Sequence, residues 1–185
     1  MISRALLLMV LPILLVSPAT AQQPPAPPAA KKKPPAAVVT KPGGPKKLGD
    51  FDDWVAATHQ EAGQPVCYAF TRAQSSSPAM TGRGAVILTV TQRMSGRDAV
   101  ALEAGYAFAQ DATVTVQADQ TGLEFYTHQR AAFARKGHDA VTAFQVAGRA
   151  ISRSPAPHDV TVTDTFSLKG FSAAYAAISK ACPPK

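Results

Sequence analysis

The sequence contains few of the residues from which metal and redox sites are usually built. It has two cysteines and four histidines in 185 residues. These six residues are widely separated along the chain, at Cys67, Cys182, His59, His128, His138 and His158. There is no C-x-x-C redox motif, and no pair of these residues has the spacing of a zinc site. We therefore expect neither a bound metal nor a cofactor.

Recognisable catalytic motifs are also missing. The chain lacks the G-x-S-x-G elbow of a serine nucleophile, and Gly82-Arg83-Gly84 lacks the remaining spacing of a dinucleotide fingerprint. The adjacent carboxylates of Asp52 and Asp53 would face opposite sides of a strand. The serine-rich stretch 75–77 is more typical of a flexible loop than of a nucleophile. The sequence predicts no catalytic residues, and a hydrolase with an unrecognised site is kept as a third alternative.

The apolar run near the start is too short to span a membrane. It extends over 12 residues, from Ala5 to Val16, and includes Pro12, whereas a bilayer requires about 20. The preceding Arg4 and the small residues up to Ala21 are typical of a secretory signal peptide. We predict a signal peptide at 1–21, cleavage after Ala21, and no transmembrane segment after its removal.

Positive charge is concentrated before the predicted domain. The net charge is +7, but Arg4 and six lysines precede residue 48, and the 12 basic residues that follow are matched by 12 acidic ones. A basic face on the domain would indicate nucleic-acid binding. Because the domain is formally neutral and the chain carries an export signal, we expect no nucleic-acid partner.

Residues 22–47 form a segment rich in proline and lysine. Such a composition favours extended, solvated chain and buries too little apolar surface to fold. We predict a disordered linker here. A second hypothesis is that its lysines make weak contacts with an anionic envelope surface, screened over about 8 Å at physiological salt.

Residues 48–185 are predicted to form one mainly β domain. Phe51 and Trp54 bracket an entry turn and are expected to face the core. Residues 73–84 contain serine, proline and glycine, which predicts a mobile loop. The run at 85–91 is mostly apolar and β-branched, which predicts a strand covered on both faces. The expected strands are 66–70, 85–91, 99–108, 112–118, 123–127, 131–134, 149–152 and 160–168.

Two helices are expected in this domain. The first would begin with Asp139 as its N-cap and end at Gly148. The second runs from 170 to 181 and presents one apolar stripe, because its apolar residues recur at steps of three and four. The stripe consists of Leu168, Phe171, Tyr175, Ile178 and Cys182.

Two further residues allow specific structural predictions. Two cysteines in an exported chain favour one disulfide, Cys67–Cys182. By the chain-entropy model, closing so long a loop contributes about 4–5 kcal/mol. Asp164 falls on the apolar face of the last strand, where a carboxylate must be paired or bound to backbone donors. We expect a structural partner such as an arginine or backbone amides.

The closing stretch TDTFSLKGFSAAYAAISKAC, residues 163–182, resembles the C-terminal signature of the invasion-associated locus B family of exported bacterial proteins. Other segments fit the same family in the same order: FDDW at 51–54, VCY around Cys67, LTVTQR at 88–93 and AGYAF at 104–108. The resemblance implies an immunoglobulin-like β-sandwich in the periplasm or outer envelope of a Gram-negative bacterium. Together with the two helices expected above, the predicted fold is such a sandwich with a short internal helix and a C-terminal helix. It brings no catalytic residues to this chain.

The sequence therefore favours a non-catalytic binding or structural module of the periplasm, with outer-membrane association or secretion as variants of that location. Its partner would be an unidentified envelope component, whether protein, lipid or polymer. The main alternative is a virulence factor acting in host-cell adhesion or invasion, as the family name implies.

Overall fold

The computed structural model describes residues 44–184, which belong to one compact unit. The predicted signal peptide, its cleavage at Ala21 and residues 22–43 of the predicted linker lie outside these residues. Within the described chain, no helix is long and apolar enough to cross a bilayer. The first strand begins at Lys46, two residues before the predicted start of the domain.

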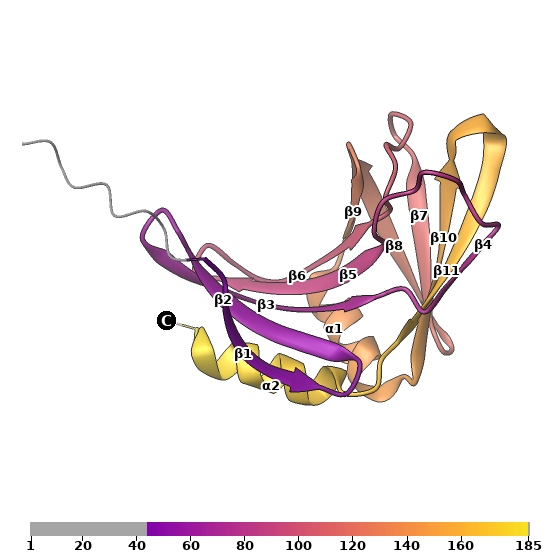
Figure 1. Cartoon of the computed structure of the whole chain (residues 1–185). Helices are drawn as coiled ribbons and strands as arrows, with labels where there is room; N and C mark the ends of the chain where they lie inside the picture. The colour runs from indigo at the N-terminus through magenta and orange to yellow at the C-terminus, as the bar shows by residue number, and fades with distance from the viewer. Residues whose placement is uncertain (1–43, 185) are drawn as a thin grey trace, which may run out of the picture. The chain divides into compact units, whose positions relative to one another are not determined.

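The described chain is mainly β, as predicted, with one internal and one C-terminal helix (Figure 1). The elements are β1 (Lys46–Phe51), β2 (Trp54–Glu61), β3 (Gln64–Arg72), β4 (Ser75–Ser77), β5 (Ile87–Arg93), β6 (Gly96–Glu103), β7 (Thr113–Ala118), β8 (Thr121–His128), β9 (Ala131–Ala134), α1 (Gly137–Val146), β10 (Arg149–Ala156), a 3-10 turn (Pro157–Asp159), β11 (Val160–Ser167) and α2 (Phe171–Ala181).

Eleven strands form an antiparallel sheet in the order β1-β2-β3-β5-β6-β9-β8-β7-β10-β11-β4. Most neighbours are also close in sequence, because short turns join them as hairpins. β6 and β9 pair only through residues 101–103 and 131–133, and the sheet changes direction there (Figure 1). The arrangement is consistent with the predicted β-sandwich, with the two strand groups joined at this junction.

The strands β3, β5 and β6 have two distinct faces. Ala69, Val90 and Val100 pair across them and are all buried, whereas the alternate residues of β5 are only half-buried. The prediction that this strand is covered on both faces is therefore wrong. The helices pack on the first face, and we call the opposite face of β2, β3, β5 and β6 the outer face.

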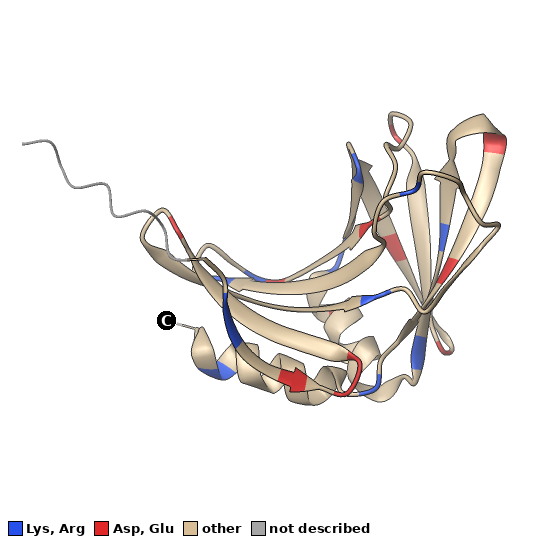
Figure 2. Ribbon diagram, viewed as in Figure 1, with Lys and Arg blue, Asp and Glu red and all other residues tan. Residues whose placement is uncertain are grey.

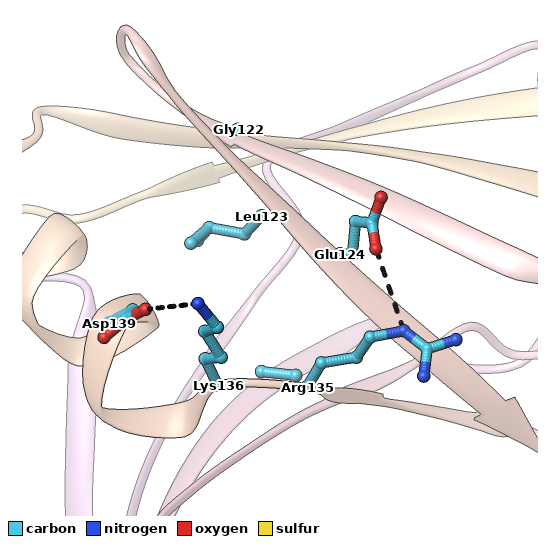
Figure 3. A pocket seen from close by; sticks show the side chains of 7 residues that line it. Gly122, Leu123, Glu124, Arg135, Lys136 and Asp139 are labelled. Carbon is cyan, nitrogen blue, oxygen red and sulfur yellow. Dashed lines mark ion pairs between the residues drawn. The ribbon is translucent and has the colours of Figure 1, made fainter.

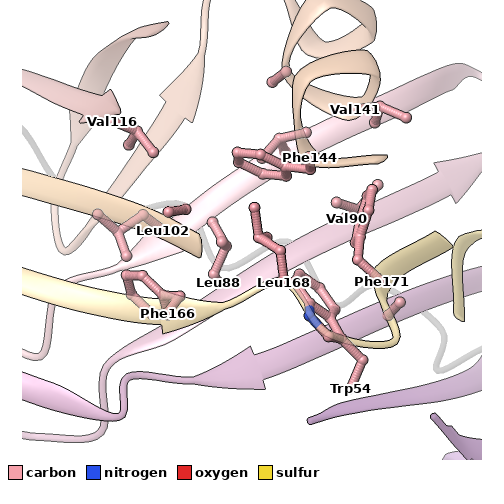
Figure 4. Close-up of a cluster of buried hydrophobic side chains, with 14 of the residues drawn as sticks. Trp54, Leu88, Val90, Leu102, Val116, Val141, Phe144, Phe166, Leu168 and Phe171 are labelled. Carbon is pink, nitrogen blue, oxygen red and sulfur yellow. The ribbon is translucent and has the colours of Figure 1, made fainter. Parts of the chain in front are cut away.

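Aromatic rings join the last helix to the sheet (Figure 4). Phe171 of α2 lies between Trp54, at 4.8 Å between ring centroids, and Phe144 of α1, at 5.6 Å. The indole Nε1 of Trp54 donates a hydrogen bond to the carbonyl of Ser167 at 3.0 Å. Burying each ring contributes about 1.5–3 kcal/mol, so these three residues largely fix the position of α2.

The disulfide Cys67–Cys182 is present and joins β3 to the end of α2, with the Cα atoms 5.9 Å apart. The predicted stripe is confirmed as well, because Phe171 and Ile178 are fully buried and Tyr175 packs against the core. α2 lies along β1, β2 and β3 (Figure 1). The sequence pattern thus identified both the helix and its covalent attachment.

The start of α1 differs from the prediction. Asp139 lies in the first turn, not at the N-cap, and Lys136 occupies the cap without a side-chain hydrogen bond. The helix begins earlier, at Gly137, which lies directly against Asp98 and where a Cβ would be 1.9 Å from the Asp98 carbonyl oxygen. A carboxylate in the first turn still favours the helix, since it faces the positive end of the dipole.

The predicted mobile loop contains a strand. Residues 75–77 form β4, which pairs with β11 at the edge of the sheet, and Ser76 lies opposite Asp164. The polar composition of this segment suits an edge strand, which is exposed to solvent. It also provides a hydrogen-bond partner for the buried carboxylate of Asp164, because Ser76 donates to it. The serines therefore take part in the fold.

Candidate functional site

Asp164 has a structural partner, as predicted, and of the two kinds expected it is an arginine. Its carboxylate is fully buried and receives both Nη atoms of Arg83, each at 2.7 Å. Ser76 donates a further hydrogen bond at 2.6 Å, and the hydroxyl of Ser152 lies at 3.4 Å. A buried charge with a bidentate partner and added hydroxyl donors is well compensated.

Arg83 has further contacts that connect this cluster to the end of β6. Its Nε donates to the carbonyl of Ala104 at 2.7 Å, and its guanidinium lies 5.1 Å from the ring centroid of Tyr106. Only 6% of the Arg83 side chain is exposed. Because the cluster is closed to solvent, it organises the segment between β4 and β5 and offers no surface to a ligand.

A second polar cluster surrounds Asp98, and sequence reasoning did not identify it. Its carboxylate accepts hydrogen bonds from Gln92 and Tyr175, both at 2.7 Å, and lies 3.0 Å from Nδ1 of His138. Burial acts to raise the pKa of Asp98, but these hydrogen bonds outweigh it and lower the pKa below its ordinary value. The signal is absent from the sequence because the four residues come from β5, β6, α1 and α2.

The Asp98 cluster connects β6 to both helices. Burial, followed by the neighbouring Asp98 carboxylate, raises the pKa of the Tyr175 phenol, which therefore remains a hydrogen-bond donor. The side chain of His138 is 81% exposed. Among the hydrogen bonds of residues 44–184, none joins His138 to a serine, so the pair lacks the nucleophile of a catalytic triad.

The outer face of the sheet carries a hollow of about 440 Å³. Side chains of β2, β3, β5 and β6 line it, and most of them are half-buried. The lining residues are His59, Val66, Tyr68, Phe70, Arg72, Ile87, Thr89, Thr91, Arg93 and Glu103. They occupy alternate positions of their strands, so the pleat of the sheet places them on one side.

Aromatic rings form one wall of this hollow. The rings of Tyr68 and Phe70 are stacked with centroids 6.2 Å apart, and His59 contacts Tyr68 edge-on at 5.6 Å. Beneath them Val66 is only 2% exposed, although it lies on the outer face. Half-exposed rings over an apolar floor are typical of binding sites for small molecules or chains.

The two ends of the hollow differ in whether their charges are paired. At one end Arg93 donates to Glu61 at 2.7 Å, and this hydrogen bond and the charge of Arg93 lower the pKa of Glu61. At the other end Arg72 and Glu103 lie in one cross-strand row on either side of Ile87. Both are exposed, and neither takes part in an ion pair within the described chain.

A second hollow, of about 370 Å³, lies between β8 and the start of α1 (Figure 3). Glu124 and Arg135 approach each other to 3.8 Å across it, as do Lys136 and Asp139. Its charges therefore neutralise one another, and it lacks an aromatic wall. We consider the hollow on the outer face the better candidate.

The remaining candidates from the sequence do not assemble into a site. Asp52 and Asp53 lie in the turn between β1 and β2, where Asp52 pairs with Lys169 at 3.1 Å. Acidic and basic residues are scattered along the described chain (Figure 2). No group of three or more His, Cys, Asp or Glu side chains in residues 44–184 could hold a metal ion.

Comparison with known proteins rests on structure alone. No protein-family model matches the chain, and no curated protein matches it in sequence. Its fold is similar to the crystal structure of invasion-associated protein B from Bartonella henselae, with a TM-score of 0.51 and 15% sequence identity. The match covers 72% of this chain and 96% of that one. The two proteins share a fold.

The shared fold agrees with the resemblance in the closing stretch. The residues that carry it, 163–182, form most of β11 and all of α2, and they include buried Asp164, Phe171 and Cys182. These residues determine how the last strand and helix pack. The stretch 163–182 is therefore explained by its part in the fold.

Proposed function

We propose that this chain is an exported bacterial protein of the invasion-associated locus B family, located in the periplasm, which binds an envelope component without catalysing a reaction. The observation that carries the proposal is the hollow on the outer face. Tyr68 and Phe70 are half-exposed there, beside two charges that have no partner in the described chain. Exposed aromatic rings of this kind are typical of an interaction site, because a partner that covers them removes apolar surface from water.

The division of the domain into two faces supports a binding role. The polar clusters of Asp98 and Asp164 have their hydrogen bonds satisfied by neighbouring side chains. They have the features of structural networks, because each buried carboxylate is bonded to several neighbouring side chains. The outer face, in contrast, has half-exposed rings and exposed charged groups that make no ion pair within the described chain.

Export is supported by the disulfide Cys67–Cys182, since such bonds persist in oxidising compartments. The predicted signal peptide adds to this argument. Fractionation of cells that produce the full chain tests the location. Recovery with the periplasmic fraction is expected, and retention in the cytoplasm would contradict the proposal.

A capture experiment tests the binding role. Envelope extracts are passed over the immobilised protein and over the Tyr68→Ala and Phe70→Ala variants. We expect a component that the wild type retains and both variants lose. Tyr126→Ala is the matched control, because Tyr126 is 46% exposed on β8 outside the hollow. Equal capture by all four proteins would exclude the hollow as the site.

Host-cell adhesion or invasion is the second candidate function. It is favoured by the fold shared with a protein whose name refers to invasion. Protease treatment of intact cells separates the two functions. Digestion of this chain at the cell surface would support contact with a host, whereas protection would support a periplasmic role.

A further inference from the structure

The hollow on the outer face extends along the strands. Its lining residues follow β3 from 66 to 72 and β5 from 87 to 93. A strand advances about 3.3 Å per residue, so the hollow is about 20 Å long. A linear occupant of about six extended residues would fill it.

The two strands that form the middle of the hollow offer different contacts. The rings of Tyr68 and Phe70 on β3 lie beside the hydroxyl-bearing side chains of Thr89 and Thr91 on β5, with which they pair directly. Within residues 44–184, neither threonine hydroxyl makes a side-chain hydrogen bond. Apolar side chains of an occupant would contact the rings, while its backbone amides would bind the hydroxyls.

The charges of Arg72 and Glu103, at what we call the open end of the hollow, indicate which charged side chains an occupant would have. Arg72 on β3 and Glu103 on β6 are separated by β5, which places their backbones about 10 Å apart. Successive side chains of an extended peptide point in opposite directions. An acidic residue next to a basic residue would therefore reach Arg72 on one side and Glu103 on the other.

We propose that the hollow binds an extended peptide with an apolar stretch and an adjoining pair of oppositely charged residues. The inference rests on the proposed binding function and names its ligand class. A polyanion fits less well, because Glu103 and Glu61 lie among the arginines of the same surface. An uncharged glycan would contact the rings but would leave both charges without partners.

The experiment uses three labelled hexapeptides and the full mature chain. Each peptide has four apolar residues followed by two charged ones: aspartate and lysine, two aspartates, or two lysines. Fluorescence anisotropy measures the dissociation constants. We expect the wild type to prefer the mixed peptide, by up to about fivefold over each of the others, as for exposed ion pairs.

Two variants change the charges at the open end. Arg72→Glu should prefer the peptide with two lysines, and Glu103→Arg the peptide with two aspartates. Arg135→Glu makes the same change in net charge as Arg72→Glu, but outside this hollow. This control variant should keep the preference of the wild type. Preferences that follow net charge in all three variants would overturn the proposal.

A further arm distinguishes this inference from the proposed function. Labelled glycan strands from purified peptidoglycan are tested with the same proteins. Binding of glycan that Tyr68→Ala abolishes, with no binding of any peptide, would overturn the peptide ligand and retain the binding function. If no probe binds and capture from envelopes does not depend on Tyr68, both proposals fail.

Discussion

The guanidinium of Arg83 binds both carboxylate oxygens of Asp164 at 2.7 Å, across 81 positions of sequence. This pair connects the segment before β5 to the last strand, and its two side chains are almost fully buried. The charges are compensated only while both partners are present. The pair therefore gives the sharpest test of how the domain is held together.

Removing one partner of this pair should be strongly destabilising. Arg83→Ala or Asp164→Ala leaves a buried charge without compensation, which costs about 3–5 kcal/mol. The midpoint of urea unfolding measures the loss. The double variant Arg83→Met with Asp164→Leu should lose less than either single change, because no charge then remains buried.

The matched control is Arg93→Ala, which breaks an arginine–carboxylate pair of the same length with Glu61 on the surface. Solvent screens this pair, so the unfolding midpoint should scarcely move. Equal losses in Arg83→Ala and Arg93→Ala would contradict the structural role of the buried pair.

The need of Asp164 for a structural partner could be predicted because the strand alternates without ambiguity. Val162 and Phe166 are buried on either side of it, so the carboxylate had to lie in the core. The identity of its partner could not be predicted, since Arg83 stands in a segment whose composition indicates a loop. Contacts between distant segments depend on the path of the chain, which local patterns do not encode.

The candidate site was less predictable for the same reason. Tyr68 and Phe70 stand in a strand that was recognised, yet which of its faces is covered depends on where α2 packs. The Asp98 cluster combines residues of four elements and has no motif. Apolar residues that repeat every two or every 3.6 positions thus identify strands, helices and their apolar faces. A surface formed by several strands can be described only once the order of the strands in the sheet is known.

Reduction of the disulfide should destabilise the domain. The bond Cys67–Cys182 closes a loop spanning 115 positions, and the chain-entropy model assigns such a loop about 4–5 kcal/mol. The Cys182→Ser variant and the reduced wild type should therefore unfold at lower urea concentration by similar amounts. Thiol labelling of the unreduced, denatured protein is the control, and two reactive thiols would show that the bond does not form.

The free energy of unfolding should decrease in acid, because the Asp98 carboxylate becomes protonated. Its pKa is lowered in the folded protein, so the folded state binds the proton less readily than the unfolded state, whose pKa is about 3.9. The contribution is fully present above that value and is lost as pH falls through the lower folded pKa. Asp98→Asn should therefore be less stable than the wild type at neutral pH, and the difference should shrink below about pH 4.

Urea unfolding between pH 3 and pH 7 measures this difference. Glu124→Gln serves as the control, because Glu124 is exposed on β8 and only loosely paired with Arg135 at 3.8 Å. Its stability relative to the wild type should depend little on pH. A constant difference between Asp98→Asn and the wild type over the whole range would show that the carboxylate charge is not what matters at this position.

Gly170 should tolerate no side chain. It precedes α2 with φ of +87°, and a Cβ there would lie 2.0 Å from the carbonyl oxygen of Phe51. Gly170→Ala combines an unfavourable backbone conformation with a clash against main chain, so a loss of about 1–3 kcal/mol or more is expected. Gly148→Ala is the matched control, since Gly148 has no atom within 4 Å of its Cβ position and no positive φ. Its unfolding midpoint should change little, and a similarly small change for Gly170→Ala would mean that the turn before α2 can shift without moving the helix from the sheet.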